Sequence, residues 1–199
     1  MSLLFETIRI LDGVPQHPKW HERRMVRSIR ELWKIDSSIN LLSLIVVPPE
    51  YSKGLAKCNI SYGPEIAGIT FNNYEKRVIR SLKLIGCDTI DYHMKYSDRT
   101  CLDALFLCRE ECDEIIIVKN GFLTDTTFSN IIFLDGQSWV TPSTPLLKGT
   151  CRERLIEQGF LEERDIMASD IAGFEGCKLI NAMRDPEEEE LIPVSQIRF

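Results

Sequence analysis

The chain has 199 residues, of which 44% are hydrophobic, and a formal net charge of −6 at pH 7. This length allows one large or two small domains with a sizeable core. The negative charge provides no basic field for nucleic acid or anionic lipid, so we expect neither partner. The longest apolar stretch, 41–47, is too short to cross a membrane, and no signal core follows a basic start, so a cytoplasmic protein is expected.

The seven cysteines are odd in number and scattered through a chain without an export signal, which favours reduced thiols over a disulfide scaffold. Cys101, Cys108 and Cys112 have helical spacing, and a metal site would be complete if His93 approached them. Small buried helix residues are the simpler interpretation, and no metal site is predicted.

Strand and helix patterns alternate through the first part of the chain. Residues 4–10 alternate apolar and polar side chains, and Asp12-Gly13 then predicts a hairpin turn. Residues 17–34 carry an apolar stripe typical of a helix. Strand-like stretches follow at 55–62, 66–71 and 78–85, with Asn72-Asn73-Tyr74 as the expected linker.

The second part predicts a helix at 99–112, strands at 114–119, 130–134, 139–141 and 177–182, and a helix after Gly149. Closely spaced turns between the strands indicate antiparallel hairpins. The whole pattern predicts an α+β fold with a small N-terminal domain, 1–75, and a larger domain, 76–199.

Three motifs carry groups with distinct chemistry. Lys95-Tyr96-Ser97-Asp98-Arg99 offers an amine that can form a Schiff base with an aldehyde, provided that partial burial and the nearby Arg99 charge lower its pKa. The stretch 125–130, DTTFSN, offers a carboxylate and an amide. Leu147-Lys148-Gly149-Thr150-Cys151-Arg152 places a glycine at a helix start, where an anion can bind backbone N–H groups.

With His21-Glu22-Arg23-Arg24 upstream, these motifs resemble the class IV aminotransferase family, the fold-type IV pyridoxal phosphate enzymes. The resemblance runs from Phe5 to Val194. It implies the two-domain fold of the D-amino acid aminotransferases, a pyridoxal 5'-phosphate cofactor and a homodimer that acts on a small amino-group substrate.

The resemblance also assigns the site residues. It implies that Lys95 is the catalytic lysine, which carries the cofactor and moves the proton at the substrate carbon. Asp125 would pair with the pyridine nitrogen. The cofactor would further contact Arg24, Gly149, Thr150, Cys151, Asn181 and Ala182. Substrate contacts are expected from Phe5, Arg99 and Met183, with Arg184 on the same side.

The sequence departs from the family pattern at several of these positions. Asp125 stands where glutamate is normal and is one methylene shorter. Cys151 replaces a common threonine, and Ala182 lacks the hydroxyl of a serine or threonine. Phe5 stands where the D-amino acid enzymes have a tyrosine, and the usual hairpin before the first strand is missing, so a shortened N-terminal domain is expected.

Three functional hypotheses follow from the resemblance. The leading one is an aminodeoxychorismate lyase, which forms 4-aminobenzoate and pyruvate in folate biosynthesis, and it is favoured by the small size and the segment from Asn181 to Val194. The second is transamination of an α-amino acid with 2-oxoglutarate. The third is a non-catalytic relative, against which the retained Lys95 argues.

Overall fold

The computed structural model describes residues 3–199. Contacts divide the chain into a first unit, Met1–Arg77 with Met94–Asp98, and a second unit, Val78–His93 with Arg99–Phe199. The domain boundary after residue 75 stays a prediction. The sequence pattern does not indicate that the short segment Met94–Asp98 belongs to the first unit.

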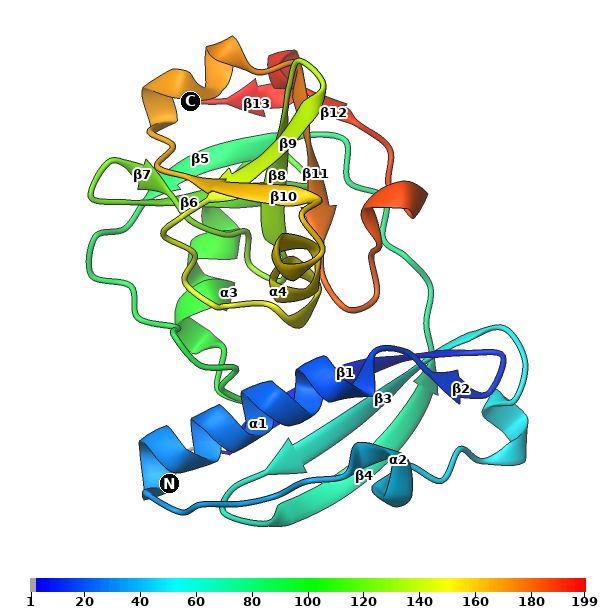
Figure 1. The fold of residues 1–199 in the computed structure, drawn as a ribbon. Helices are drawn as coiled ribbons and strands as arrows, with labels where there is room; N and C mark the ends of the chain where they lie inside the picture. The colour runs from blue at the N-terminus through cyan, green and yellow to red at the C-terminus, as the bar shows by residue number, and fades with distance from the viewer. Residues whose placement is uncertain (1–2) are drawn as a thin grey trace. The chain divides into compact units, whose positions relative to one another are not determined.

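The first unit is built on an antiparallel sheet with strand order β2-β1-β3-β4 (Figure 1). The opening hairpin is confirmed, because Asp12 and Gly13 both adopt positive φ angles, 48° and 77°. Asn72 and Asn73 do not belong to a linker, since they pair with β3 at the end of β4. The strands are β1 (Leu4–Leu11), β2 (Val14–Pro15), β3 (Leu55–Tyr62) and β4 (Ile66–Asn73).

The long helix α1 (Pro18–Trp33) lies along this sheet and confirms the helix expected at 17–34. Pro18 suits the first helical position, and the left-handed Lys34 ends the helix by donating its N–H to the Arg30 carbonyl. Met25 and Ile29 pack with the inward side chains of β1 and β3, which makes the core of this unit. A single turn, α2 (Leu41–Leu44), follows.

The second unit contains two sheets. One has the order β13-β5-β6-β7, and the other has the order β10-β9-β8-β11-β12. The expected antiparallel hairpins are present, but β13–β5, β5–β6 and β9–β10 are parallel pairs. The strand bounds are β5 (Leu82–Gly86), β6 (Glu114–Lys119), β7 (Phe122–Leu123), β8 (Asn130–Asp135), β9 (Ser138–Pro142), β10 (Leu161–Arg164), β11 (Gly176–Ile180), β12 (Ile192–Pro193) and β13 (Ile197–Arg198).

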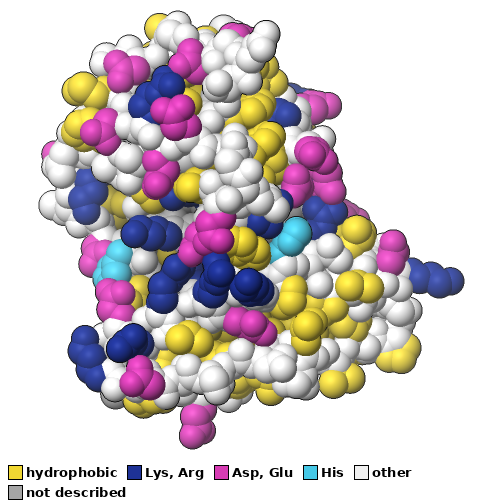
Figure 2. Space-filling model, viewed as in Figure 1, with side chains coloured by type: hydrophobic (Ala, Val, Ile, Leu, Met, Phe, Trp, Pro, Cys, Tyr) yellow, Lys and Arg dark blue, Asp and Glu magenta, His cyan; other side chains and the backbone are white. Residues whose placement is uncertain are grey.

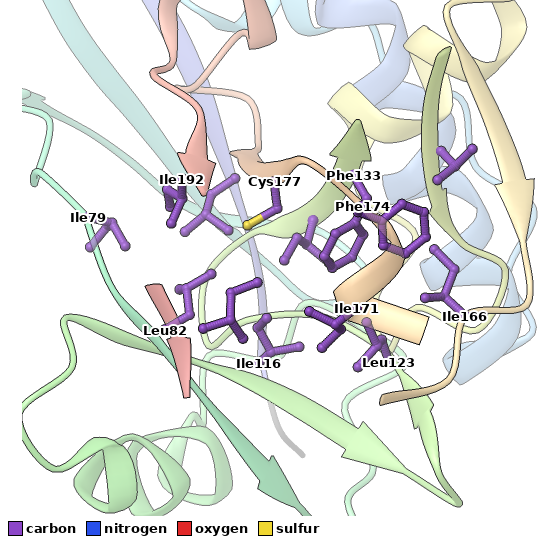
Figure 3. Packing of buried hydrophobic residues seen from close by; sticks show 14 residues of the cluster. Ile79, Leu82, Ile116, Leu123, Phe133, Ile166, Ile171, Phe174, Cys177 and Ile192 are labelled. Carbon is purple, nitrogen blue, oxygen red and sulfur yellow. The ribbon is translucent and has the colours of Figure 1, made fainter. Parts of the chain in front are cut away.

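The main core of the second unit is aliphatic and aromatic, as Figure 3 shows. Phe133 of β8 and Phe174 stack with ring centroids 4.9 Å apart, and Leu82 and Ile116 of the other sheet belong to the same cluster. The strand predicted at 78–85 begins only at Leu82, where the pairing with Glu114 of β6 starts. This shared apolar core joins the two sheets of the second unit.

Two helices complete the second unit, α3 (Thr100–Phe106) and α4 (Thr150–Glu157). The helix predicted to reach residue 112 ends at Phe106, and a 3-10 turn over Leu107–Arg109 leads to Glu110, whose φ is 54°. The interpretation of these three cysteines as small buried helix residues is therefore wrong for all of them. Cys101 and Cys108 are exposed, and Cys112 is buried but lies beyond the end of the helix.

The surface of the second unit carries acidic and basic side chains interspersed with each other on the face seen in Figure 2. Among residues 3–199, no three or more side chains of His, Cys, Asp or Glu are grouped as a metal ion would require. None of the helices in this range has the length and apolar character needed to cross a bilayer.

Candidate active site

Lys95 is held on the first unit by backbone pairing with the start of β1. The Phe5 N–H donates to the Lys95 carbonyl at 3.0 Å, and Tyr96 forms a bridge with Leu4. The Lys95 side chain is half-buried, with its Nζ 4.6 Å from the centroid of the Phe5 ring. The structure therefore brings together Lys95 and Phe5, which the sequence places in one site.

Beside them, three charged or polar side chains are buried between β1 and α1. Arg24 donates from Nε to Glu6 Oε1 at 2.8 Å and from Nη2 to Glu6 Oε2 at 2.5 Å. His21 Nδ1 lies 2.6 Å from Glu6 Oε2. Glu6 has no exposed surface. Glu6 is not among the predicted site residues, although its place in the strand, two residues from each of the inward-facing Leu4 and Ile8, indicates that its side chain is buried.

The protonation states in this cluster follow from its burial and from the charges and hydrogen bonds within it. Burial alone would raise the pKa of Glu6, but the Arg24 charge and the bonds from Arg24 and His21 lower it to about 2. Burial lowers the pKa of His21, and the charges of Arg24 and Lys95 lower it further, while Glu6 opposes them. At neutral pH the cluster thus contains a carboxylate, a guanidinium and a neutral imidazole that donates its Nδ1–H to Glu6.

Arg24 has one edge of its guanidinium occupied by Glu6. Because Nε and Nη2 both donate to the carboxylate of Glu6, the orientation of the guanidinium is fixed. The phosphate role of Arg24 stays a prediction, with its orientation now defined by Glu6.

In the second unit, Asp125 is buried and its carboxylate is held at both oxygens. Asn130 Nδ2 donates to Oδ1 at 2.7 Å, and the Leu147 N–H donates to Oδ2 at 2.8 Å. Burial raises the pKa of Asp125 to about 6, although these bonds and the Arg152 charge lower it. A cation placed against Asp125 would favour its ionised form, as a pyridinium would.

The loop between Asp125 and Asn130 is tied to three other segments that the sequence assigns to the site. Arg99, which precedes α3, donates from Nη2 to the Thr127 carbonyl at 2.7 Å. Asn181 Nδ2 donates to the Phe128 carbonyl at 3.3 Å. Asn130 Nδ2 also reaches the Leu147 carbonyl at 2.9 Å. Residues far apart in the sequence therefore converge on one loop of the second unit.

Gly149 precedes α4 and lies against Asn130. A Cβ at Gly149 would stand 2.0 Å from Asn130 Oδ1, although the φ of −71° is ordinary. The glycine is thus required for close packing and not for an unusual backbone. It opens an eight-residue helix whose first N–H groups lack partners within the helix, which is the condition for binding an anion.

The Thr150 and Cys151 side chains are both buried. Cys151 lies in an apolar cluster with Ile132 and Leu155, and burial raises the pKa of its thiol to about 11. The thiol is directed into the interior, so a contact of Cys151 with a phosphate would use its backbone N–H. The cofactor roles of both residues stay predictions.

Around Asn181, the chain turns tightly beside the Asp125 loop. The Met183 N–H donates to Asn181 Oδ1 at 2.8 Å, and Ala182 between them is half-buried. Met183 and Arg184 are each 3% exposed, and Arg184 pairs with Glu189. The substrate-side roles of these two residues stay predictions, and little of either side chain is accessible in this structure.

A pocket of about 410 Å³ lies in the second unit next to the Asp125 loop. Thr124 and Leu146 line it, and they are the chain neighbours of Asp125 and of Leu147, whose N–H binds the Asp125 carboxylate. The remaining lining is Ile90, Asp91, Tyr92, His93, Lys119, Asn120, Phe122, Thr144 and Pro145. None of these lining residues is among the predicted site residues.

Gly149→Ala is expected to destabilise the protein by about 1 to 3 kcal/mol, because the new Cβ overlaps Asn130. The cost should be smaller in an Asn130→Ala background, where the overlapping oxygen is absent. Gly86→Ala is the matched control, since a Cβ there meets nothing within 4 Å. Denaturant unfolding of the wild type, both single variants and the double variant measures the coupling, and equal costs of Gly149→Ala in both backgrounds would contradict the packing explanation.

Because Asp125 is buried, the difference in stability between the wild type and Asp125→Asn, both without cofactor, is expected to depend on pH. Its folded pKa of about 6 exceeds the ordinary 3.8, so its contribution to stability is full below pH 3.8 and is lost as pH rises through 6. The advantage of wild type over Asp125→Asn should fall by up to about 3 kcal/mol between about pH 4 and about pH 7.5. Denaturant titrations of both proteins at both pH values test this prediction, and an equal stability difference at the two pH values would contradict it.

Known proteins resemble this chain in sequence. A sequence model of the family described as amino-transferase class IV matches residues 94–197. An uncharacterized protein of Haemophilus influenzae is 42% identical over 185 residues, which are 92% of this chain and 98% of that protein. A protein of Schizosaccharomyces pombe proposed to be an aminodeoxychorismate lyase is 32% identical over 77 residues, 36% of this chain and 33% of that protein.

The fold has a close counterpart among solved structures. The crystal structure of a protein of Haemophilus somnus 129PT, proposed to be a 4-amino-4-deoxychorismate lyase, superposes with a TM-score of 0.87. It is 36% identical in sequence, and the match covers 93% of this chain and 98% of that one.

Proposed function

Because the chain belongs to the amino-transferase class IV family, we propose that it is a pyridoxal phosphate-dependent lyase that converts 4-amino-4-deoxychorismate into 4-aminobenzoate and pyruvate. The predicted family, the α+β fold of fold-type IV and the assignment as an enzyme of the lyase or aminotransferase kind are confirmed. The observation that carries the choice of reaction is the likeness, over nearly the whole chain, to the Haemophilus somnus protein.

The residues present fit the cofactor. The first unit presents the half-buried amine of Lys95 and the guanidinium of Arg24. The second unit presents the buried carboxylate of Asp125, and a helix start at Gly149 where an added Cβ would collide with Asn130. An amine, an anion site and a carboxylate are the three kinds of group that pyridoxal phosphate requires.

When bound, pyridoxal phosphate supplies an aldehyde that condenses with an amine and a ring that accepts the electron pair released at the neighbouring carbon. The amine of Lys95 would hold the cofactor and would take the proton from the substrate carbon that bears the amino group. Asp125 would keep a proton on the ring nitrogen, and its bonds from Asn130 and Leu147 fix the direction of the carboxylate. Arg24 and the N–H groups that open α4 hold the phosphate.

The class IV family also contains aminotransferases, and the same residues would serve transamination of an α-amino acid with 2-oxoglutarate. That reaction needs a proton returned to the cofactor carbon, whereas the lyase expels pyruvate and gains an aromatic ring. A catalytically inactive relative is the third hypothesis. Under all three we propose that the chain forms a homodimer in the cytoplasm, which light scattering on purified protein and cell fractionation would check.

Product analysis separates these functions. The protein with pyridoxal phosphate is incubated with 4-amino-4-deoxychorismate and, separately, with mixed amino acids and 2-oxoglutarate. The proposal predicts 4-aminobenzoate and pyruvate in equal amounts from the first reaction. Glutamate without pyruvate would assign an aminotransferase instead, and no product from either mixture would overturn both assignments. Boiled protein is the blank for each mixture.

A further inference from the structure

Arg99 contacts the backbone of the loop that carries Asp125. Its Nη2 donates to the Thr127 carbonyl at 2.7 Å, and Arg99 itself stands directly before α3. The side chain is half-buried in the second unit. A guanidinium bound to a carbonyl forms a charge-assisted hydrogen bond, which is stronger than one between neutral groups.

Other backbone and side-chain groups of the same loop also form hydrogen bonds. The Asp125 carbonyl accepts from the Ile117 N–H at 2.8 Å, and the Thr126 N–H donates to the Ser129 carbonyl at 2.9 Å. Thr127 Oγ1 donates to Glu114 Oε1 at 2.9 Å, and Glu114 has no exposed surface. Arg99 thus completes a set of bonds that fixes the backbone from Asp125 to Asn130.

We propose that Arg99 is a positioning residue, which holds the Thr127 carbonyl and so keeps the Asp125 carboxylate directed at the ring nitrogen of the cofactor, in place of the substrate contact that the resemblance implies. The proposal rests on the proposed function of Asp125. The bond from Arg99 Nη2 to the protein backbone is the observation that favours a positioning role, because it directs this donor at the loop that carries Asp125.

Arg99→Met tests the proposal, because methionine keeps the length and apolar stem of the side chain and removes every donor. Arg99→Lys keeps the positive charge and a hydrogen-bond donor, so its effects are expected to be smaller than those of Arg99→Met. Arg109→Met is the matched control from the turn after the same helix, where the guanidinium lies over the Phe106 ring and bonds to the Phe106 carbonyl.

Three readouts are compared in the wild type and in these variants. Hydrogen exchange of peptides spanning 124–130, measured without cofactor, should accelerate in Arg99→Met and not in Arg109→Met. The absorption spectrum with added pyridoxal phosphate should shift in the same direction as that of Asp125→Asn. With substrate, kcat should fall by about ten- to a hundred-fold while KM stays within about three-fold.

The proposal fails if exchange in the 124–130 peptides is unchanged in Arg99→Met. It also fails if KM rises by ten-fold or more at constant kcat, which would mark Arg99 as a substrate ligand. Additive effects of Arg99→Met and Asp125→Asn on kcat would likewise show that the two residues act separately. If the wild type turns over neither substrate, the proposed function fails, and the exchange and absorption measurements still decide the role of Arg99.

Discussion

Lys95→Ala is expected to abolish the visible absorption band of the lysine-bound cofactor and to lower turnover by about a thousand-fold or more. The substitution removes both the amine that holds the aldehyde and the base that moves the proton at the substrate carbon. The fold should survive, because the contact that anchors this segment uses the Lys95 carbonyl, which alanine retains. Absorption spectra, turnover and the melting temperature of the variant provide the three measurements.

Lys53→Ala is the control for this result. Lys53 is an exposed lysine of the same unit, in the segment before β3, and its loss should leave the band and the turnover intact. A band that persists in Lys95→Ala would show that another lysine holds the cofactor. A lost band together with a large fall in melting temperature would instead indicate misfolding, which the unaffected anchor argues against.

Glu6→Ala should destabilise the protein by about 3 to 5 kcal/mol, the range typical of removing one partner from a buried ion pair. The Glu6 side chain is 0% exposed, and its removal leaves Arg24 and His21 without the carboxylate to which both are bonded. Denaturant unfolding measures the loss. Glu50→Ala, at an exposed glutamate of the same unit, should change stability by less than about 0.5 kcal/mol.

The pH dependence gives this prediction a second test. The folded pKa of Glu6 is about 2, below the ordinary 4.5, so its contribution to stability is present above pH 4.5 and is lost as pH falls through 2. The penalty of Glu6→Ala should therefore shrink in acid. The double variant Glu6→Leu with Arg24→Met should cost less than Glu6→Ala alone, since no unpaired charge remains. A pH-independent penalty would mean that Glu6 acts by packing alone.

Local patterns in the sequence predict most elements of this fold. The strand over residues 4–10, the turn at Asp12-Gly13 and the helix over 17–34 all follow from side-chain periodicity and from residues suited to turns and helix ends. The patterns fail where tertiary pairing competes with local preference. Asn72 and Asn73 have a preference for turns, yet ladder bonds to β3 extend the strand through them.

In the candidate site, too, local sequence patterns predict some features and tertiary contacts decide the others. The motif at Lys95 and the motif at Asp125 are recognisable from residue types and spacing, because the chemistry of an amine and a carboxylate is carried by single side chains. The partner of Arg24 is not recognisable, since Glu6 meets it only when α1 packs on β1. The sequence also does not show why position 149 needs glycine, because Asn130, whose side chain leaves no room for a Cβ, is nineteen positions away in the chain.

The sequence by itself thus determined the family and most of the elements, and it named the candidate reactive side chains, since these depend on residue types at short separations. Only the tertiary structure decided their environments: the neutral His21, the carboxylate of Glu6 on one edge of Arg24, the raised pKa of Asp125 and the anchoring of its loop by Arg99. Burial and long-range hydrogen bonds set charge and direction, and both arise only when distant segments pack together.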